Sequence, residues 1–228
     1  MPKARESFDD VAWDKNDKDW EESQKKLRLK STCRQVEALA EKALGKTSAS
    51  LVSPIFFGGF NVLYRIKFEQ DSSDVIVWLP CPDLVQFPEE KTLYEAAAMA
   101  YLADNTIIPV PILFYHTSSS DVGPALVLQH IKSVRDMSDA FAIPNQDPEE
   151  TPVLNPGIEE VTLRKLHQKM AVIVLELYKP TFPRIGSLTQ VEKGRYEVSG
   201  RPIRYLTNSA LYMRTNCNYP NKKHDSLI

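Results

Sequence analysis

The sequence predicts an α+β fold in which a five-stranded antiparallel sheet carries one helix inserted after its third strand. Three β-rich segments between residues 51 and 79 are joined by a Gly-Gly pair and by a Ser/Asp cluster. An Ala-rich helical segment begins at Pro88, and two further apolar strands, 112–116 and 125–131, follow it. Short strands separated by tight turns pair most simply as antiparallel neighbours.

Length and composition are those of an ordinary soluble globular protein. The chain has 228 residues, 43% hydrophobic and 25% charged, with a formal net charge of −2. This balance gives no electrostatic reason to expect nucleic acid or an anionic membrane as the main partner. Its three cysteines are scattered without metal-ligand spacing, which favours a reducing compartment. Without a signal-like leader or a membrane-length apolar stretch, the protein is expected in the cytoplasm or nucleus, with cytoplasmic as the first assignment.

The N-terminal part reads as a leader followed by a helix. Residues 1–19 are polar and charged, and we expect them to be disordered. The segment 20–48 holds a predicted helix from Trp20 to Leu44, with a weak apolar stripe. Gly45 is a natural C-terminal stop for this helix.

The next segment, 49–142, carries the predicted sheet. Residues 51–57 form a β-rich run, which Gly58-Gly59 connects to a strand over 61–68. That second strand alternates, with its apolar residues on one face and its cations on the other. A third strand covers 75–79.

A helix is predicted from Pro88 to about Asn105. Pro at the first turn, Glu89 and Glu90 near the positive end of the helix dipole, and an Ala-rich body all favour it. The run from Pro109 to Pro111 cannot be helical and leads the chain, extended, into the fourth strand.

The C-terminal half is predicted to hold a linker and a second unit. Residues 143–157 contain four prolines among acidic residues and read as a linker, and 158–228 follow as a separate region. A helix over 159–178 repeats apolar residues at three- and four-residue steps, giving one wide apolar face. A hairpin over 187–198 turns at Lys193-Gly194 and leads into a polar tail.

Five short strings in series resemble the fungal phosphotransferase family, relatives of the aminoglycoside phosphotransferases. They cover roughly Leu51 to Asn216 and lie at 57–66, 90–111, 123–129, 183–188 and 200–203. The resemblance implies a protein-kinase-like small lobe over 49–142 and an incomplete start of the large helical lobe over 158–228. A truncated relative is therefore expected.

The resemblance also implies ATP and Mg²⁺ as cofactors and assigns the nucleotide contacts. Backbone N–H groups at the glycine turn would approach phosphate oxygens, and Glu95 would orient a phosphate-holding cation. The end of strand five would meet the adenine edge. The alternative for the glycine turn is a plain hairpin turn, and the alternative for Glu95 is a solvated surface side chain. The implied nucleotide-contacting residues are Gly58, Gly59, Phe60, Asn61, Trp78, Glu95, Gln129, His130 and Ile131.

Two departures from the family pattern remove the expected chemistry. Trp78 stands where the family places Arg or Lys, and its single neutral N–H cannot neutralise phosphate. Arg65 or Lys67 could substitute, with an outward-facing cation as the alternative for each. The His-Gly-Asp-x-x-x-x-Asn catalytic loop is missing, since no Asp in the chain is followed five positions later by Asn. We therefore name no catalytic and no metal-binding residue, and we expect ATP and Mg²⁺ binding to be weak or absent.

The sequence leaves three functional hypotheses. The first is an ATP-dependent phosphotransferase that acts on an alcohol group, by family membership but inactive in this chain. The others are a non-catalytic, pseudokinase-like interaction module and a truncated gene product. The apolar face of helix 159–178 predicts a protein partner or self-association, with no role for nucleic acid or membrane. His116 and His167 are expected to be structural rather than metal ligands, and His224 to be solvated.

Overall fold

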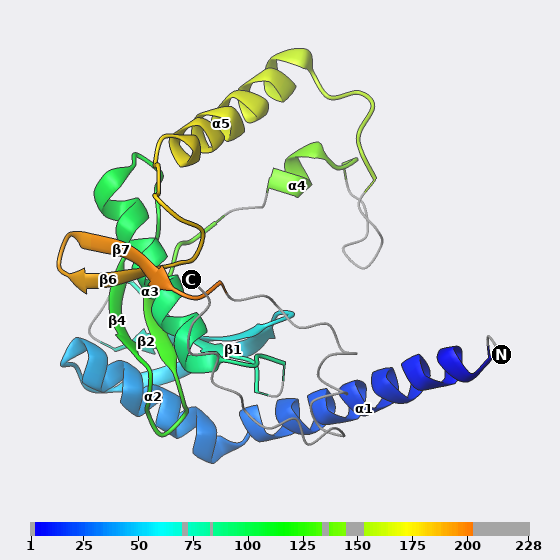
Figure 1. Ribbon diagram of the computed structural model, residues 1–228, viewed down its shortest axis with the longest axis vertical. Helices are drawn as coiled ribbons and strands as arrows, with labels where there is room; N and C mark the ends of the chain where they lie inside the picture. Colours follow the sequence, from blue (N-terminus) through cyan, green and yellow to red (C-terminus); the bar gives the residue numbers. More distant parts are fainter. Residues whose placement is uncertain (1–2, 70–72, 83, 134–136, 145–152, 203–228) are drawn as a thin grey trace.

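The fold is α+β and contains a five-stranded antiparallel sheet, which confirms the predicted class at this level (Figure 1). The computed structural model describes residues 3–69, 73–82, 84–133, 137–144 and 153–202. The strand order is β1-β2-β3-β5-β4. The strands of this sheet are β1 Ala49–Phe57, β2 Asn61–Phe68, β3 Val75–Pro80, β4 Leu113–Thr117 and β5 Ala125–Gln129.

The sheet is covered by helices on both faces, because its inner strands are apolar on both sides. Alternate residues of β2 and β3 are buried with helix α2 Lys30–Leu44, in a core that includes Tyr64 and Val77. The opposite face packs Trp78 and Leu126 against helix α3 Pro88–Asn105. Burial of apolar side chains in these two layers drives the fold.

The N-terminal segment differs from the prediction. Residues 3–19 are helical, as the first part of α1 Lys3–Leu27, where a disordered leader was expected. The segment contains no Pro or Gly after Pro2, so nothing in it interrupts a helix. Trp20, near the end of α1, packs edge-on against Phe57 with ring centroids 5.8 Å apart.

The helix predicted over 20–44 is broken in two near Leu29. The hydroxyl of Tyr64 donates a hydrogen bond of 2.8 Å to the carbonyl oxygen of Leu27. In an uninterrupted helix this carbonyl would accept the amide of Ser31. A contact from β2 therefore ends α1, and α2 restarts at Lys30 and stops at Gly45, whose φ is 63°. The predicted glycine stop is confirmed.

The elements after the sheet follow the prediction with small changes of length. Helix α3 has the predicted bounds, while β5 ends at Gln129, two residues early. A short helix, α4 Met137–Phe141, was not predicted. Helix α5 Glu160–Tyr178 and the hairpin of β6 Ser187–Glu192 and β7 Arg195–Gly200 are confirmed, with Gly194 at its turn at φ 75°.

Parts of two predicted regions lie outside the described residues. These are 145–152 of the expected linker and 203–228 of the expected tail. Among the helices that the structure describes, none is long and apolar enough to cross a membrane.

The outer edge of β1 is bonded by two carboxylates from α2. The amide of Leu51 donates to Glu37 at 2.9 Å, and the amide of Ala49 donates to Glu41 at 3.0 Å. Glu37 is buried and also pairs with Arg34 at 2.8 Å. Such bonds use the free N–H groups of an edge strand, which would otherwise be open to pairing with another chain.

Substitution of Glu37 by Leu should lower the free energy of unfolding by about 2 kcal/mol, because the amide of Leu51 loses its acceptor in a half-buried site. Glu41→Leu is the matched control on the same helix face. It should cost roughly half as much, since Glu41 is less buried and water can replace it. Urea denaturation of both variants measures the difference, and equal losses would contradict the role given to burial.

Candidate functional site

The glycine turn joins β1 and β2, as predicted, but its amides are partly used within the turn. The Gly58 N–H donates to the Asn61 carbonyl at 2.8 Å, and the Phe60 carbonyl accepts the Cys81 N–H at 2.8 Å. Neither Gly58 nor Gly59 has a positive φ. A Cβ on Gly59 would meet nothing within 4 Å. The turn is thus a bonded hairpin connection, and the Gly58 amide is not free for a phosphate.

A buried lysine that the sequence analysis missed lies beside this turn. The side chain of Lys91, on α3, is 4% exposed. Its Nζ donates to Asn61 Oδ1 at 2.6 Å and to Glu95 Oε1 at 2.6 Å. The i, i+4 spacing of Lys91 and Glu95 could have indicated the pair, but nothing in the sequence showed that it is turned inward.

Glu95 therefore has a cationic partner, although Trp78 stands at the strand position where the resemblance implies the cation. The partner comes from the same helix rather than from a strand. The proposed substitutes do not fill this role: Arg65 pairs with Asp74 at 2.5 Å, and Lys67 is exposed on β2. Burial raises the pKa of the Cys81 thiol to about 11, and the nearby positive charge of Lys91 acts in the opposite direction.

Trp78 occupies the centre of β3 and faces α3. It is the neighbour of Leu63 on β2 and of Leu126 on β5, and it packs with Ala96 and Met99. Its Nε1 is buried and has no hydrogen-bond partner among the described residues. The indole fills the space between sheet and helix, and it supplies no charge there.

The residues expected to meet the adenine edge, Gln129, His130 and Ile131, lie at the other end of β3 from the glycine turn. Gln129 pairs with Val75, whereas Asn61 pairs with Pro80. The two positions are five residue steps apart along β3, a distance of roughly 17 Å. The structure therefore does not bring Gln129, His130 and Ile131 into contact with the turn.

Part of the backbone of these residues is also hydrogen-bonded within the protein. The His130 amide donates to the Asp74 carbonyl at 3.2 Å, and the Gln129 amide donates to the Ile112 carbonyl at 2.8 Å. Burial and the nearby Arg65 lower the pKa of the His130 imidazole, although Asp74 opposes them. Its Nδ1 is buried without a partner in the described part of the chain. Protonation of His130 is thus disfavoured.

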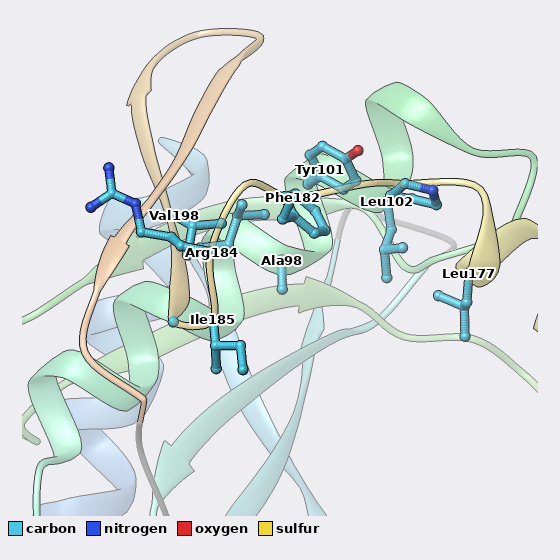
Figure 2. A pocket seen from close by; sticks show the side chains of 11 residues that line it. Ala98, Tyr101, Leu102, Leu177, Phe182, Arg184, Ile185 and Val198 are labelled. Carbon is cyan, nitrogen blue, oxygen red and sulfur yellow. The ribbon is translucent and has the colours of Figure 1, made fainter.

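A cavity of about 430 Å³ lies away from all of these positions, between α3, the end of α5 and the β6–β7 hairpin (Figure 2). Sequence analysis did not predict it, since its walls come from three separate segments of the chain. The residues that line it are Ala98, Tyr101, Leu102, Leu177, Pro180, Phe182, Arg184, Ile185, Gly186, Leu188 and Val198.

No group of three or more His, Cys, Asp or Glu side chains among the described residues is arranged to hold a metal ion. His167 contacts its own helix, with Nδ1 2.9 Å from the Leu163 carbonyl, and stacks edge-on with Phe141. His224 lies outside the described residues.

Removal of either partner of the buried ion pair should have unequal effects. Glu95→Ala should lower the free energy of unfolding by about 3 kcal/mol, because it leaves the buried Lys91 ammonium without its counter-charge. Lys91→Met should cost only about 1 kcal/mol, because Glu95 is 28% exposed and can be hydrated. Chemical denaturation of the two variants tests this order, and the reverse order would show that Lys91 is solvated in solution.

Comparison of the chain with family models, with curated proteins and with solved structures found no match.

Proposed function

We propose that this chain is a non-catalytic, protein-kinase-like small lobe of the aminoglycoside phosphotransferase type, which acts by binding a protein partner through α5. One observation carries the binding role: the C-terminal half of α5 is apolar except at Glu176, and its large apolar side chains remain exposed. The phosphotransferase relationship comes from the sequence resemblance alone.

Helix α5 has almost no packing of its own within the described structure. Glu176 is its only buried residue, and it bonds to Lys179 on the next turn. Figure 1 shows α5 standing away from the sheet. Over 170–178 the exposed large apolar residues are Met170, Val172, Ile173, Val174, Leu175, Leu177 and Tyr178.

Consecutive residues of a helix point about 100° apart, so these side chains surround the axis except on the side of the buried Glu176. Val174 and Leu175 are 61% and 63% exposed. A helix that is hydrophobic all round is stable in water only when other protein covers it. The composition of α5 therefore favours a partner protein that covers this helix.

The predicted nucleotide site supports the non-catalytic part of the proposal. The Gly58 amide and the His130 amide already have partners within the protein. Lys91, which lies beside the turn, is neutralised by Glu95 and bonded to Asn61. A phosphate would have to displace these bonds, and it would gain no additional charge from Trp78.

Addition of Mg-ATP should not raise the melting temperature of the chain appreciably, because the groups that could grip phosphate are already bonded. Differential scanning fluorimetry over a nucleotide series measures this. A saturable rise at sub-millimolar ATP, absent in Lys91→Met, would refute the non-catalytic reading and assign the phosphate contact to Lys91.

The double substitution Val174→Lys, Leu175→Lys should leave the free energy of unfolding within about 0.5 kcal/mol of the wild type, because neither side chain packs inside the chain. It should also remove the binding of an apolar dye. Urea denaturation and dye fluorescence measure these effects, with Gln168→Lys as the control on the same helix. A wild type that binds no dye, or a variant that fails to fold, would show that α5 is covered by its own chain.

A further inference from the structure

The cavity between α3, α5 and the β6–β7 hairpin is continuous with the exposed surface of α5. Leu177 belongs to both, and it is 50% exposed. Ile185, at 93% exposure, and Phe182, at 47%, extend the apolar surface beyond the helix. The cavity is therefore the hollow part of one apolar surface and not a separate site.

The aromatic side chains in the wall of this cavity are held in place by neighbouring rings and by a hydrogen bond. Tyr101 packs between Phe182 and Tyr196, with ring centroids 5.5 and 5.3 Å away. The Tyr196 hydroxyl donates to Asp104 at 2.5 Å, and burial together with this bond raises its pKa to about 12. Because Asp104 and Tyr101 are both on α3, the hydrogen bond fixes the hairpin against the helix that forms the wall.

A second contact closes the hairpin at its base. Arg201 donates to both carboxylate oxygens of Glu90, at 2.9 and 2.8 Å, and its guanidinium lies 3.7 Å from the ring centroid of Phe87. Gly186 approaches the Gly200 carbonyl so closely that a Cβ would lie 2.7 Å from it. The walls are thus set before anything binds, which lowers the entropic cost of binding.

The lining of the cavity accepts an apolar group of moderate size. A volume of about 430 Å³ lies in the range of small-ligand sites and exceeds that of one aromatic side chain. In Figure 2 the guanidinium of Arg184 points away from Ala98 and Leu177, so no charge is directed between these two side chains. A large apolar side chain fits this lining better than a charged ligand.

The α5 side of this surface is basic, although the whole chain has a net charge of −2. The stretch 159–186 contains five Lys or Arg and three Glu. Arg164 pairs with Glu160, and Lys179 with Glu176, whereas Lys165 and Lys169 have no ion pair among the described residues. These two lysines line a second hollow with Leu166. A second copy of the chain would bring like charges together, whereas an acidic partner would be attracted.

We propose that the cavity receives one large apolar side chain, a Trp, Phe or Leu, from an acidic amphipathic segment of the partner, whose carboxylates meet Lys165 and Lys169. The proposal rests on the proposed function and adds the chemistry of the partner to it. The segment would use the cavity as the anchor point of the interface, the position that commonly dominates binding energy.

Two synthetic peptides of about 16 residues, long enough for roughly four helical turns, test the chemistry. Both carry Leu and one Trp at helical spacing, and they differ only in having Glu or Lys at the remaining positions. Fluorescence anisotropy with the full chain should show the acidic peptide binding at least about tenfold tighter. The double charge reversal Lys165→Glu, Lys169→Glu should invert the preference. Equal binding of both peptides to the wild type would overturn the assignment of an acidic partner.

Ala98→Phe tests the cavity, because its ring would occupy the space meant for the anchor. It should weaken binding of the acidic peptide by about tenfold. Ala103→Phe, at an exposed position on the same helix, should leave this affinity unchanged. If Ala98→Phe has no effect and the Val174→Lys, Leu175→Lys variant abolishes binding, α5 remains the interface and the anchor cavity is refuted. If Ala98→Phe alone weakens binding, the cavity stands and the role of α5 in the proposed function is refuted.

Discussion

The burial of both faces of the inner strands is the constraint on which the rest of this structure depends. Strand β5 is buried along almost its whole length, and β3 alternates between a face under α2 and a face under α3. A sheet of this kind needs a helical layer on each side. Tyr64 reaches out of the sheet to end α1, and α3 is pressed so close to the glycine turn that Lys91 is buried against Asn61.

The same packing explains why the polar groups at the predicted nucleotide site already have partners within the protein. The position where the family resemblance expects a phosphate-holding cation is filled by the Trp78 indole, which belongs to the layer between sheet and helix. Lys91 restores a positive charge nearby, but Glu95 neutralises it and Asn61 accepts a second hydrogen bond from it. A buried ammonium is stable only with such partners, so the cluster reads as an element of folding rather than as an open binding site.

The helix α5 presents the opposite situation. The sheet and its two helical layers satisfy their own apolar surface, whereas α5 exposes residues that resemble a protein interior. The hairpin β6–β7 docks on α3 through Tyr196 and Arg201, and it leaves an apolar hollow beside the end of α5. The apolar hollow thus lies where two well-packed elements meet an uncovered one.

Local sequence signals determined the elements of this protein. Alternation predicted β2, Pro88 and the acidic first turn predicted α3, and glycines marked both the end of α2 and the turn of the hairpin. These signals act between neighbours along the chain, so one sequence is enough to read them. The break near Leu29, the inward turn of Lys91 and the walls of the cavity each depend on groups far apart in the sequence, such as Tyr64 with Leu27 and Tyr196 with Asp104. Only the tertiary structure decided these, because a side chain's partners are set by packing between elements and not by its place in any one of them.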